Sequence, residues 1–192
     1  MKKTLLFLML TTLIFACKKE DGNPITSTTT NTTSGVEGCT DILATNYNAE
    51  ATVDDGSCEY PPSALKLSSI TINAMPMTNN GSDWDVGLAG FENPDVFYVL
   101  KQGSGDISSS SSQDNVSAFP ILFTENLPYT INNLSQEYTI ELYDNDQIAG
   151  VGENELIGSC SFIPNNFITV GGDEINITNN GIDMTLAIQW IQ

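Results

Sequence analysis

The chain carries the sequence YTIELYDND at positions 138–146, and NELIG follows at positions 154–158. The alternation of apolar and polar residues in the first stretch predicts a β-strand that ends in two carboxylates, Asp144 and Asp146. Because residues two apart on a strand point to the same side, both carboxylates can face one ion. The chain then returns through Glu155 into a second apolar run. The pattern predicts two strands joined by an acidic loop.

A second stretch has the same character. The sequence DWD at positions 83–85 opens a loop, and ENPD at positions 92–95 closes it immediately before the apolar run VFYV. Carboxylates therefore stand at both ends of this loop as well.

The region from Ala64 to Gln192 reads as short β-rich runs separated by Gly, Asn and Asp clusters, without helical periodicity. It predicts an all-β fold, an antiparallel eight-stranded β-sandwich. Gly103–Asp106 and Ser108–Ser112 are expected to form a flexible polar loop. Cys160 lies on a strand and is expected to be a buried free thiol. Of the seven or eight strands expected, the sequence places seven, at 65–74, 95–101, 118–124, 137–143, 156–163, 174–178 and 183–191.

With these motifs, residues 65–192 resemble a C2 domain, a family in which two acidic loops at one end of a sandwich bind calcium. The resemblance implies that calcium ligands come from both loops. Three features depart from the family pattern: Pro94 precedes Asp95 instead of following it, the second loop is longer, and Glu155 stands where Asp is common. The basic strand face that the family uses for phosphoinositides is missing. The implied ligands are Asp85, Asp95, Asp144, Asp146 and Glu155.

Calcium prefers six to eight oxygen ligands, which five carboxylates together with carbonyls and water can supply. Without an ion, the same carboxylates repel each other. The alternative is that these Asp and Asn residues are only turn formers at strand ends.

The same loops carry apolar side chains. If these are exposed, they form a binding tip beside the ions that suits insertion into lipid or into a pocket of a partner. The alternative is that Trp84 and Phe91 cap the core. The residues of the expected tip are Trp84, Leu88, Phe91, Ile148 and Val151.

Residues 38–60 are too few to build their own core. They contain Cys39 and Cys58, which predict a disulfide in an exported protein. The segment resembles a short Cys-Thr-Asp…Asp-Asp-Gly-Ser-Cys module of secreted Bacteroidota proteins. Asp41, Asp54 and Asp55 could hold a second metal ion, or the module could be only a disulfide-stapled spacer.

Residues 1–16 have a basic start and an apolar run of the length of a signal peptide, too short to span a bilayer. The run ends in Ala16-Cys17, which resembles a lipobox and predicts lipidation of Cys17. Several acyl chains on one cysteine give stable membrane anchoring. A secretory signal with an incidental cysteine is the alternative.

The sequence KKED at positions 18–21 resembles the export signal of Bacteroidota lipoproteins that reach the outer face of the outer membrane. A charged spacer is the alternative. The remainder of residues 17–37 is rich in Thr, Ser and Asn and predicts a flexible tether.

Charge and composition exclude several function classes. The chain has 24 acidic and 6 basic residues, and Lys66 and Lys101 are the only basic residues after position 19. Such a surface repels phosphate backbones, so nucleic-acid binding is not expected. The absence of histidine removes Ser-His-Asp catalysis and the usual zinc sites.

The sequence therefore predicts a cell-surface lipoprotein with a calcium-binding C2-like module that binds a membrane, a glycan or a protein partner. The alternative is a structural accessory subunit of an outer-membrane assembly, in which calcium only stabilises the fold. An enzyme is not expected, because the paired carboxylates lie in loops rich in Gly and Asn and not in an apolar cleft.

Overall fold

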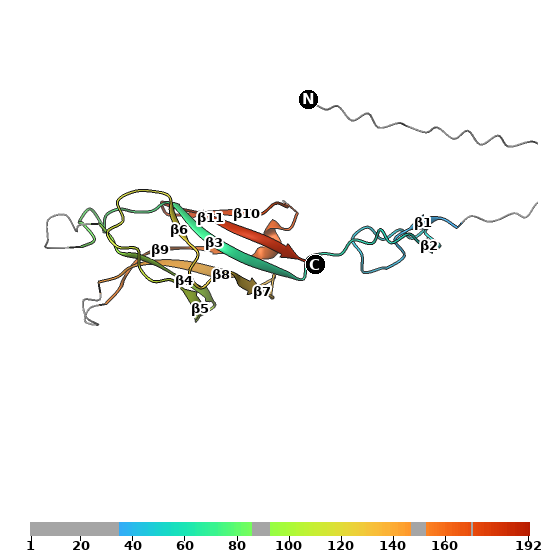
Figure 1. Ribbon diagram of the computed structural model, residues 1–192, viewed down its shortest axis with the longest axis horizontal. Helices are drawn as coiled ribbons and strands as arrows, with labels where there is room; N and C mark the ends of the chain where they lie inside the picture. The colour runs from blue at the N-terminus through green and yellow to red at the C-terminus, as the bar shows by residue number, and fades with distance from the viewer. Residues whose placement is uncertain (1–34, 86–92, 147–152, 170) are drawn as a thin grey trace, which may run out of the picture. The chain divides into compact units, whose positions relative to one another are not determined.

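The computed structural model describes residues 35–85, 93–146, 153–169 and 171–192. The sandwich begins with β3 (Ala64–Ala74), and its strands are antiparallel throughout. One sheet has the order β10-β11-β3-β6, with β7 also paired to β3, and the other has the order β5-β4-β8-β9. Figure 1 shows the two sheets as layers with their strands nearly aligned. The other elements are β4 (Val96–Gln102), β5 (Gly105–Ser109), β6 (Ile121–Phe123), β7 (Tyr129–Ile131), β8 (Tyr138–Asp144), β9 (Glu155–Phe162), the 3-10 helix η1 (Pro164–Phe167), β10 (Glu174–Asn179) and β11 (Ile182–Ile191).

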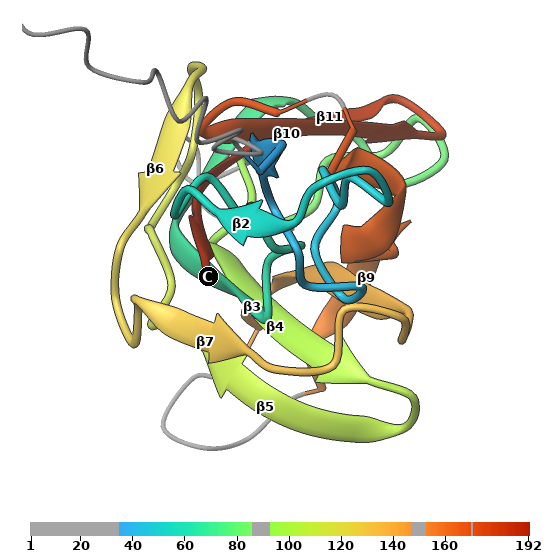
Figure 2. The same cartoon turned by 90° about the vertical axis from the view of Figure 1, so that its right-hand side faces the viewer.

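The prediction of an eight-stranded antiparallel sandwich is confirmed. Strands β6 and β7 pair with two successive parts of β3, β6 with Ile70–Ile72 and β7 with Leu65–Leu67. They therefore occupy one strand position between them. Figure 2, which looks along the strands, shows β6 and β7 at the same edge of the sandwich.

Strands β5 and β7 lie outside the runs that the sequence predicted as strands. Strand β5 lies in the segment that was predicted to be a flexible polar loop, so that prediction is wrong for Gly105–Ser109. Its backbone pairs with β4, from Val99 opposite Ser109 to Gln102 opposite Gly105. Backbone hydrogen bonds therefore hold this strand, although its side chains offer little apolar surface.

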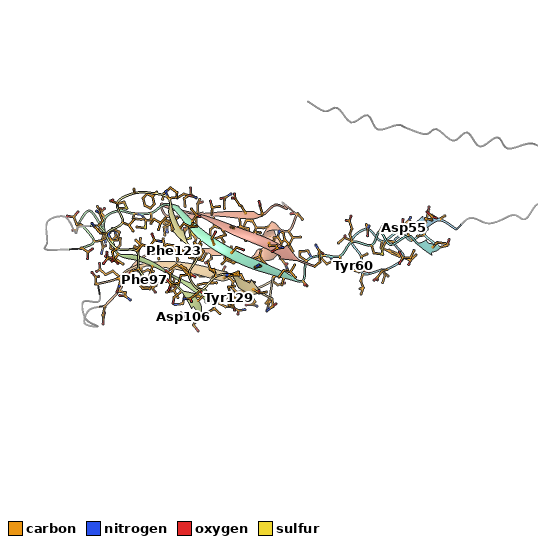
Figure 3. The ribbon with its side chains drawn as sticks, in the orientation of Figure 1. Asp55, Tyr60, Phe97, Asp106, Phe123 and Tyr129 are labelled. Carbon is orange, nitrogen blue, oxygen red and sulfur yellow. A yellow bond between two sulfur atoms is a disulfide. The ribbon has the colours of Figure 1, made fainter. Side chains whose placement is uncertain are left out.

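Alternation of side chains builds the core between the sheets. In β8, Ile140 and Leu142 are fully buried, whereas the intervening residues are half-buried on the outer face. Phe123 meets Tyr98 edge-on inside the sandwich, and Phe97 stacks on Tyr143 on the outer face of the other sheet. Figure 3 labels Phe97 and Phe123. Cys160 is a buried free thiol, as predicted.

The predicted disulfide between Cys39 and Cys58 is present. The module around it has only two very short strands, β1 (Glu37–Gly38) and β2 (Val53–Asp54), which pair in parallel. Asp55 and Tyr60 belong to this module (Figure 3). Within the described residues, no helix is long and apolar enough to span a membrane.

The core accounts for most of the stability of the sandwich, so we expect Leu100→Ala to lower the free energy of unfolding by about 2–5 kcal/mol. Leu100 is 0% exposed, whereas Leu122 on β6 is 55% exposed. The same change at Leu122 should alter stability by no more than about 0.5 kcal/mol. Urea unfolding curves of both variants measure the difference, and equal losses would contradict this assignment of the core.

Candidate metal centre

Strand pairing brings the two acidic loops to the same end of the sandwich. Asp144, the last residue of β8, lies opposite Val96 on one side and Glu155 on the other. Asp95 directly precedes Val96, so it is also at this end. This is the left-hand end of the sandwich in Figure 1, and the C-terminus lies at the other end.

Asp144 is the central residue of the site. Its side chain is 0% exposed, and Oδ1 accepts a hydrogen bond from the backbone amide of Asp95 at 2.6 Å. Oδ2 is buried and has no hydrogen-bond partner among the described residues. Burial is the largest cause that raises the pKa of Asp144 to about 6, and the charges of the Asp85, Asp146 and Asp95 carboxylates add to it. The hydrogen bond from the Asp95 backbone amide acts in the opposite direction but is outweighed.

Two further carboxylates converge on Asp144. Asp85, Asp144 and Asp146 each offer an oxygen atom, and these three atoms lie within 4.8 Å of one another. The pKa values of Asp85 and Asp146 are also raised, first by partial burial and then by neighbouring carboxylates. The structure therefore brings together these three predicted ligands, one from the first loop and two from the second.

No basic side chain among the described residues neutralises this cluster. Lys101, five residues along β4 from Val96 and so roughly 17 Å away, binds Glu141 at 3.1 Å and Asp106 at 3.3 Å. Lys66 lies near the start of β3, at the opposite end of the sandwich. These are the only lysines in the part of the chain that the structure describes. The cluster is therefore an unbalanced negative site, which a cation can stabilise.

The other two predicted ligands flank the cluster. Asp95 accepts a hydrogen bond from the backbone amide of Asn115, and Glu155 accepts one from the side chain of Asn79 at 3.3 Å. The charge of Asp95 contributes to the raised pKa values of all three clustered carboxylates, and Glu155 contributes to that of Asp146. Each has one carboxylate oxygen hydrogen-bonded within the protein.

Three residues at this end were not predicted from the sequence. Asn115 belongs to a third loop, whose backbone pairs with Val96 through Gln113. Asn79 holds Glu155, as described above. Asn154 directly precedes Glu155, and its buried Oδ1 has no partner among the described residues. Asn residues beside strand ends were treated as turn formers, and their place next to the acidic motifs is the signal that could have identified them.

The expected binding tip is partly contradicted. Trp84 is only 6% exposed, and its Nε1 donates a hydrogen bond to the backbone oxygen of Pro76 at 3.1 Å. Trp84 is therefore buried because the chain folds back onto Pro76. Its assignment to an exposed tip is wrong, and the alternative of a buried Trp84 is confirmed. The other four residues of the expected tip, Leu88, Phe91, Ile148 and Val151, lie outside the described residues.

The disulfide module does not gather its carboxylates in the same way. Asp41 accepts hydrogen bonds from the Leu43 amide at 2.9 Å and from the Tyr60 hydroxyl at 2.7 Å, which lower its pKa. Asp54 and Asp55 each accept a backbone amide two residues ahead. Among the residues that the structure describes, only Asp85, Asp144 and Asp146 form a group of three potential ligands. The possible second metal site is therefore not assembled here.

No protein-family model matches the chain, and no curated protein matches it. Solved structures with a similar fold include a C2 domain, with 16% identity, a TM-score of 0.43, and coverage of 67% of this chain and 98% of that one. The paired C2 domains of Extended-Synaptotagmin 2, solved with calcium bound, are 15% identical with a TM-score of 0.44, and the match covers 68% of this chain and 46% of that one. Human GIVD cytosolic phospholipase A2 is 12% identical with a TM-score of 0.41, and the match covers 67% of this chain and 17% of that one.

The buried charge of Asp144 predicts a pH-dependent effect of Asp144→Asn. The pKa of Asp144 is raised in the folded state from 3.8 to about 6. The stability that the protonated Asp144 side chain contributes is therefore fully present below pH 3.8 and is lost as the pH rises through 6. With calcium chelated, Asp144→Asn should therefore stabilise the protein at pH 7 by up to about 3 kcal/mol and have little effect near pH 4.

Unfolding curves from pH 4 to pH 7 measure this difference. Asp173→Asn, which removes one exposed carboxylate outside the acidic loops, is the control. A stability difference between wild type and Asp144→Asn that does not change with pH would contradict the assignment.

Proposed function

We propose that this chain is a surface lipoprotein whose C2-like sandwich binds calcium through Asp85, Asp144 and Asp146. The end of the sandwich that carries the ion, called the loaded end, then faces a partner. The observation that carries the proposal is the buried Oδ2 of Asp144, which has no partner among the described residues and belongs to a group of three converging carboxylates. Leaving a buried charge unpaired costs several kcal/mol, so this arrangement favours a bound cation.

The donor set favours calcium over other metals. The cluster offers only oxygen atoms, and the chain has no histidine, so softer metals such as zinc lack their usual ligands. Asp95 and Glu155 stand beside the cluster and can add oxygens if the loops adjust. Calcium accepts six to eight oxygens in irregular geometry, whereas magnesium demands a compact octahedron.

The loaded end can serve as a calcium-dependent binding surface. Bound calcium reduces the negative charge of this end and can accept an oxygen from a lipid, a glycan or a protein in place of water. Without calcium, the same end repels anionic groups. The proposed role is binding and not catalysis.

The N-terminal residues support attachment of the sandwich to a membrane. Cys17 follows an apolar run and small Ala16, the pattern that resembles a lipobox, and the KKED sequence resembles a surface-export signal. The polar segment before Val36 then serves as a tether, whereas Val36 and Glu37, which the sequence assigned to the tether, pair with residues of the disulfide module. In this proposal the protein is held at the outer membrane and faces the exterior.

One observation favours a structural role for calcium as a second candidate function. Trp84 is buried and hydrogen-bonded, so it is not available for insertion into a lipid layer or a pocket. In this alternative, calcium rigidifies the loops of an accessory subunit in an outer-membrane assembly.

Calcium should raise the melting temperature of the full chain in detergent. A ligand that binds only the folded state adds about 2.7 kcal/mol of stability at a hundredfold excess over its dissociation constant. We expect the shift to be lost in Asp144→Asn/Asp146→Asn and retained in the matched pair Asp54→Asn/Asp55→Asn, with magnesium as the ion control. A shift lost only in the second pair would place the ion in the disulfide module, and no shift at millimolar calcium would contradict calcium binding altogether.

Cys17→Ser should abolish membrane anchoring, because it removes the proposed acylation site while leaving the sandwich unchanged. Partition of the protein between detergent and aqueous phases measures the effect, with Cys160→Ala as the control. Retention of Cys17→Ser in the detergent phase would contradict lipid attachment at this residue.

A further inference from the structure

Asp85 reaches the cluster from a short segment, residues 76–85, that is folded by its own contacts. A two-residue turn at Asn80-Gly81 closes it, with hydrogen bonds from the Asn79 amide to the Ser82 oxygen at 2.8 Å and from the Ser82 amide to the Asn79 oxygen at 3.0 Å. Asn80 has φ 54° and Gly81 has φ 90°. Two positive φ values in succession are typical of a type I′ turn, which Asn-Gly favours.

Trp84 fixes the other end of this segment. Its indole Nε1 donates to the backbone oxygen of Pro76 at 3.1 Å, so the residue immediately before Asp85 is tied to the start of the segment. Pro76 in turn follows Met75, which is 5% exposed and packs in the core between the sheets. The hydrogen bond to Pro76 therefore connects Trp84 to the core of the sandwich.

The turn is also connected to the second acidic loop. The side-chain amide of Asn80 donates to Oδ1 of Asn79 at 3.0 Å, and the amide of Asn79 donates to Oε2 of Glu155 at 3.3 Å. The segment therefore contacts the start of β9, next to the strand end that carries Asp144.

From these contacts we infer that residues 76–85 form a preformed arm that holds Asp85 in the carboxylate cluster before calcium binds, with Trp84 as the positioning residue. The inference rests on the proposed calcium site and explains why three like charges stay close in its absence. A preformed ligand lowers the cost of ordering the site on binding. Calcium affinity then depends on residues that do not touch the ion.

Two tryptophans provide a matched test. Trp84→Phe keeps an aromatic ring and removes the N–H that binds Pro76, whereas Nε1 of Trp190 has no partner among the described residues. Loss of a residue that orients a metal ligand typically weakens metal binding by about 10- to 100-fold. Calorimetric titration of the full chain in detergent should show about tenfold weaker calcium binding for Trp84→Phe and wild-type affinity for Trp190→Phe.

Two glycines provide a second matched pair that leaves every predicted ligand in place. Gly81 and Gly172 both have φ 90°, and a Cβ atom at either would meet no atom within 4 Å. Alanine is strained at this φ in both positions, so both variants should lose similar stability in chelator. Only Gly81→Ala, in the turn of the arm, should weaken calcium binding.

The state of the arm without calcium is measured by fluorescence of Trp190→Phe, in which Trp84 is the only tryptophan. We expect Trp84 to be protected from acrylamide quenching in chelator, with little change when calcium is added. Strong quenching in chelator that calcium suppresses would overturn the inference, because the arm would then form only with the ion.

Equal calcium affinities within both variant pairs would overturn it as well, while leaving the calcium site intact. Failure of the wild-type chain to bind calcium would overturn the proposed function and, with it, this role of the arm.

Discussion

The hydrogen bond from the Asp95 amide to Oδ1 of Asp144 joins the two acidic loops at the end of the sandwich. It occupies one carboxylate oxygen and leaves Oδ2 buried without a partner among the described residues. Strand β8 pairs with β4 on one side and β9 on the other, and Asp144 at its end is 0% exposed. Burial of a partly satisfied carboxylate is unfavourable, and the raised pKa of Asp144 expresses that cost.

The electrostatic imbalance of the site follows from the distribution of charge along the chain. Lys101 is engaged by Glu141 and Asp106, and Lys66 lies at the far end of the sandwich, so the described residues offer the cluster no internal counter-charge. A protein with a net charge of −18 gains from any cation that binds the folded state preferentially. In this account, the fold retains an unfavourable cluster because the bound ion resolves it and supplies a surface for a partner.

Much of the fold could be predicted from the sequence, because strands such as β8 and β11 alternate between buried and less buried residues. Strand β5 could not, since its residues are small and polar and its pairing depends on backbone geometry that β4 imposes. Among the site residues, Asp144 and Asp146 were predictable from their spacing in one strand end. The sequence left both an exposed and a buried Trp84 open, because its burial depends on a turn at Asn80-Gly81 that reverses the chain onto Pro76. That Asn-Gly pair is a recognised hairpin signal and could have indicated the turn.

The most direct test of calcium binding by the acidic cluster is a crystal structure of the protein grown with saturating calcium, with anomalous scattering used to locate the ion. We expect an ion bound to Oδ2 of Asp144 and to carboxylate oxygens of Asp85 and Asp146, at calcium–oxygen distances of about 2.3–2.6 Å. An ordered cluster with no ion, or an ion bound only by the disulfide module, would contradict it.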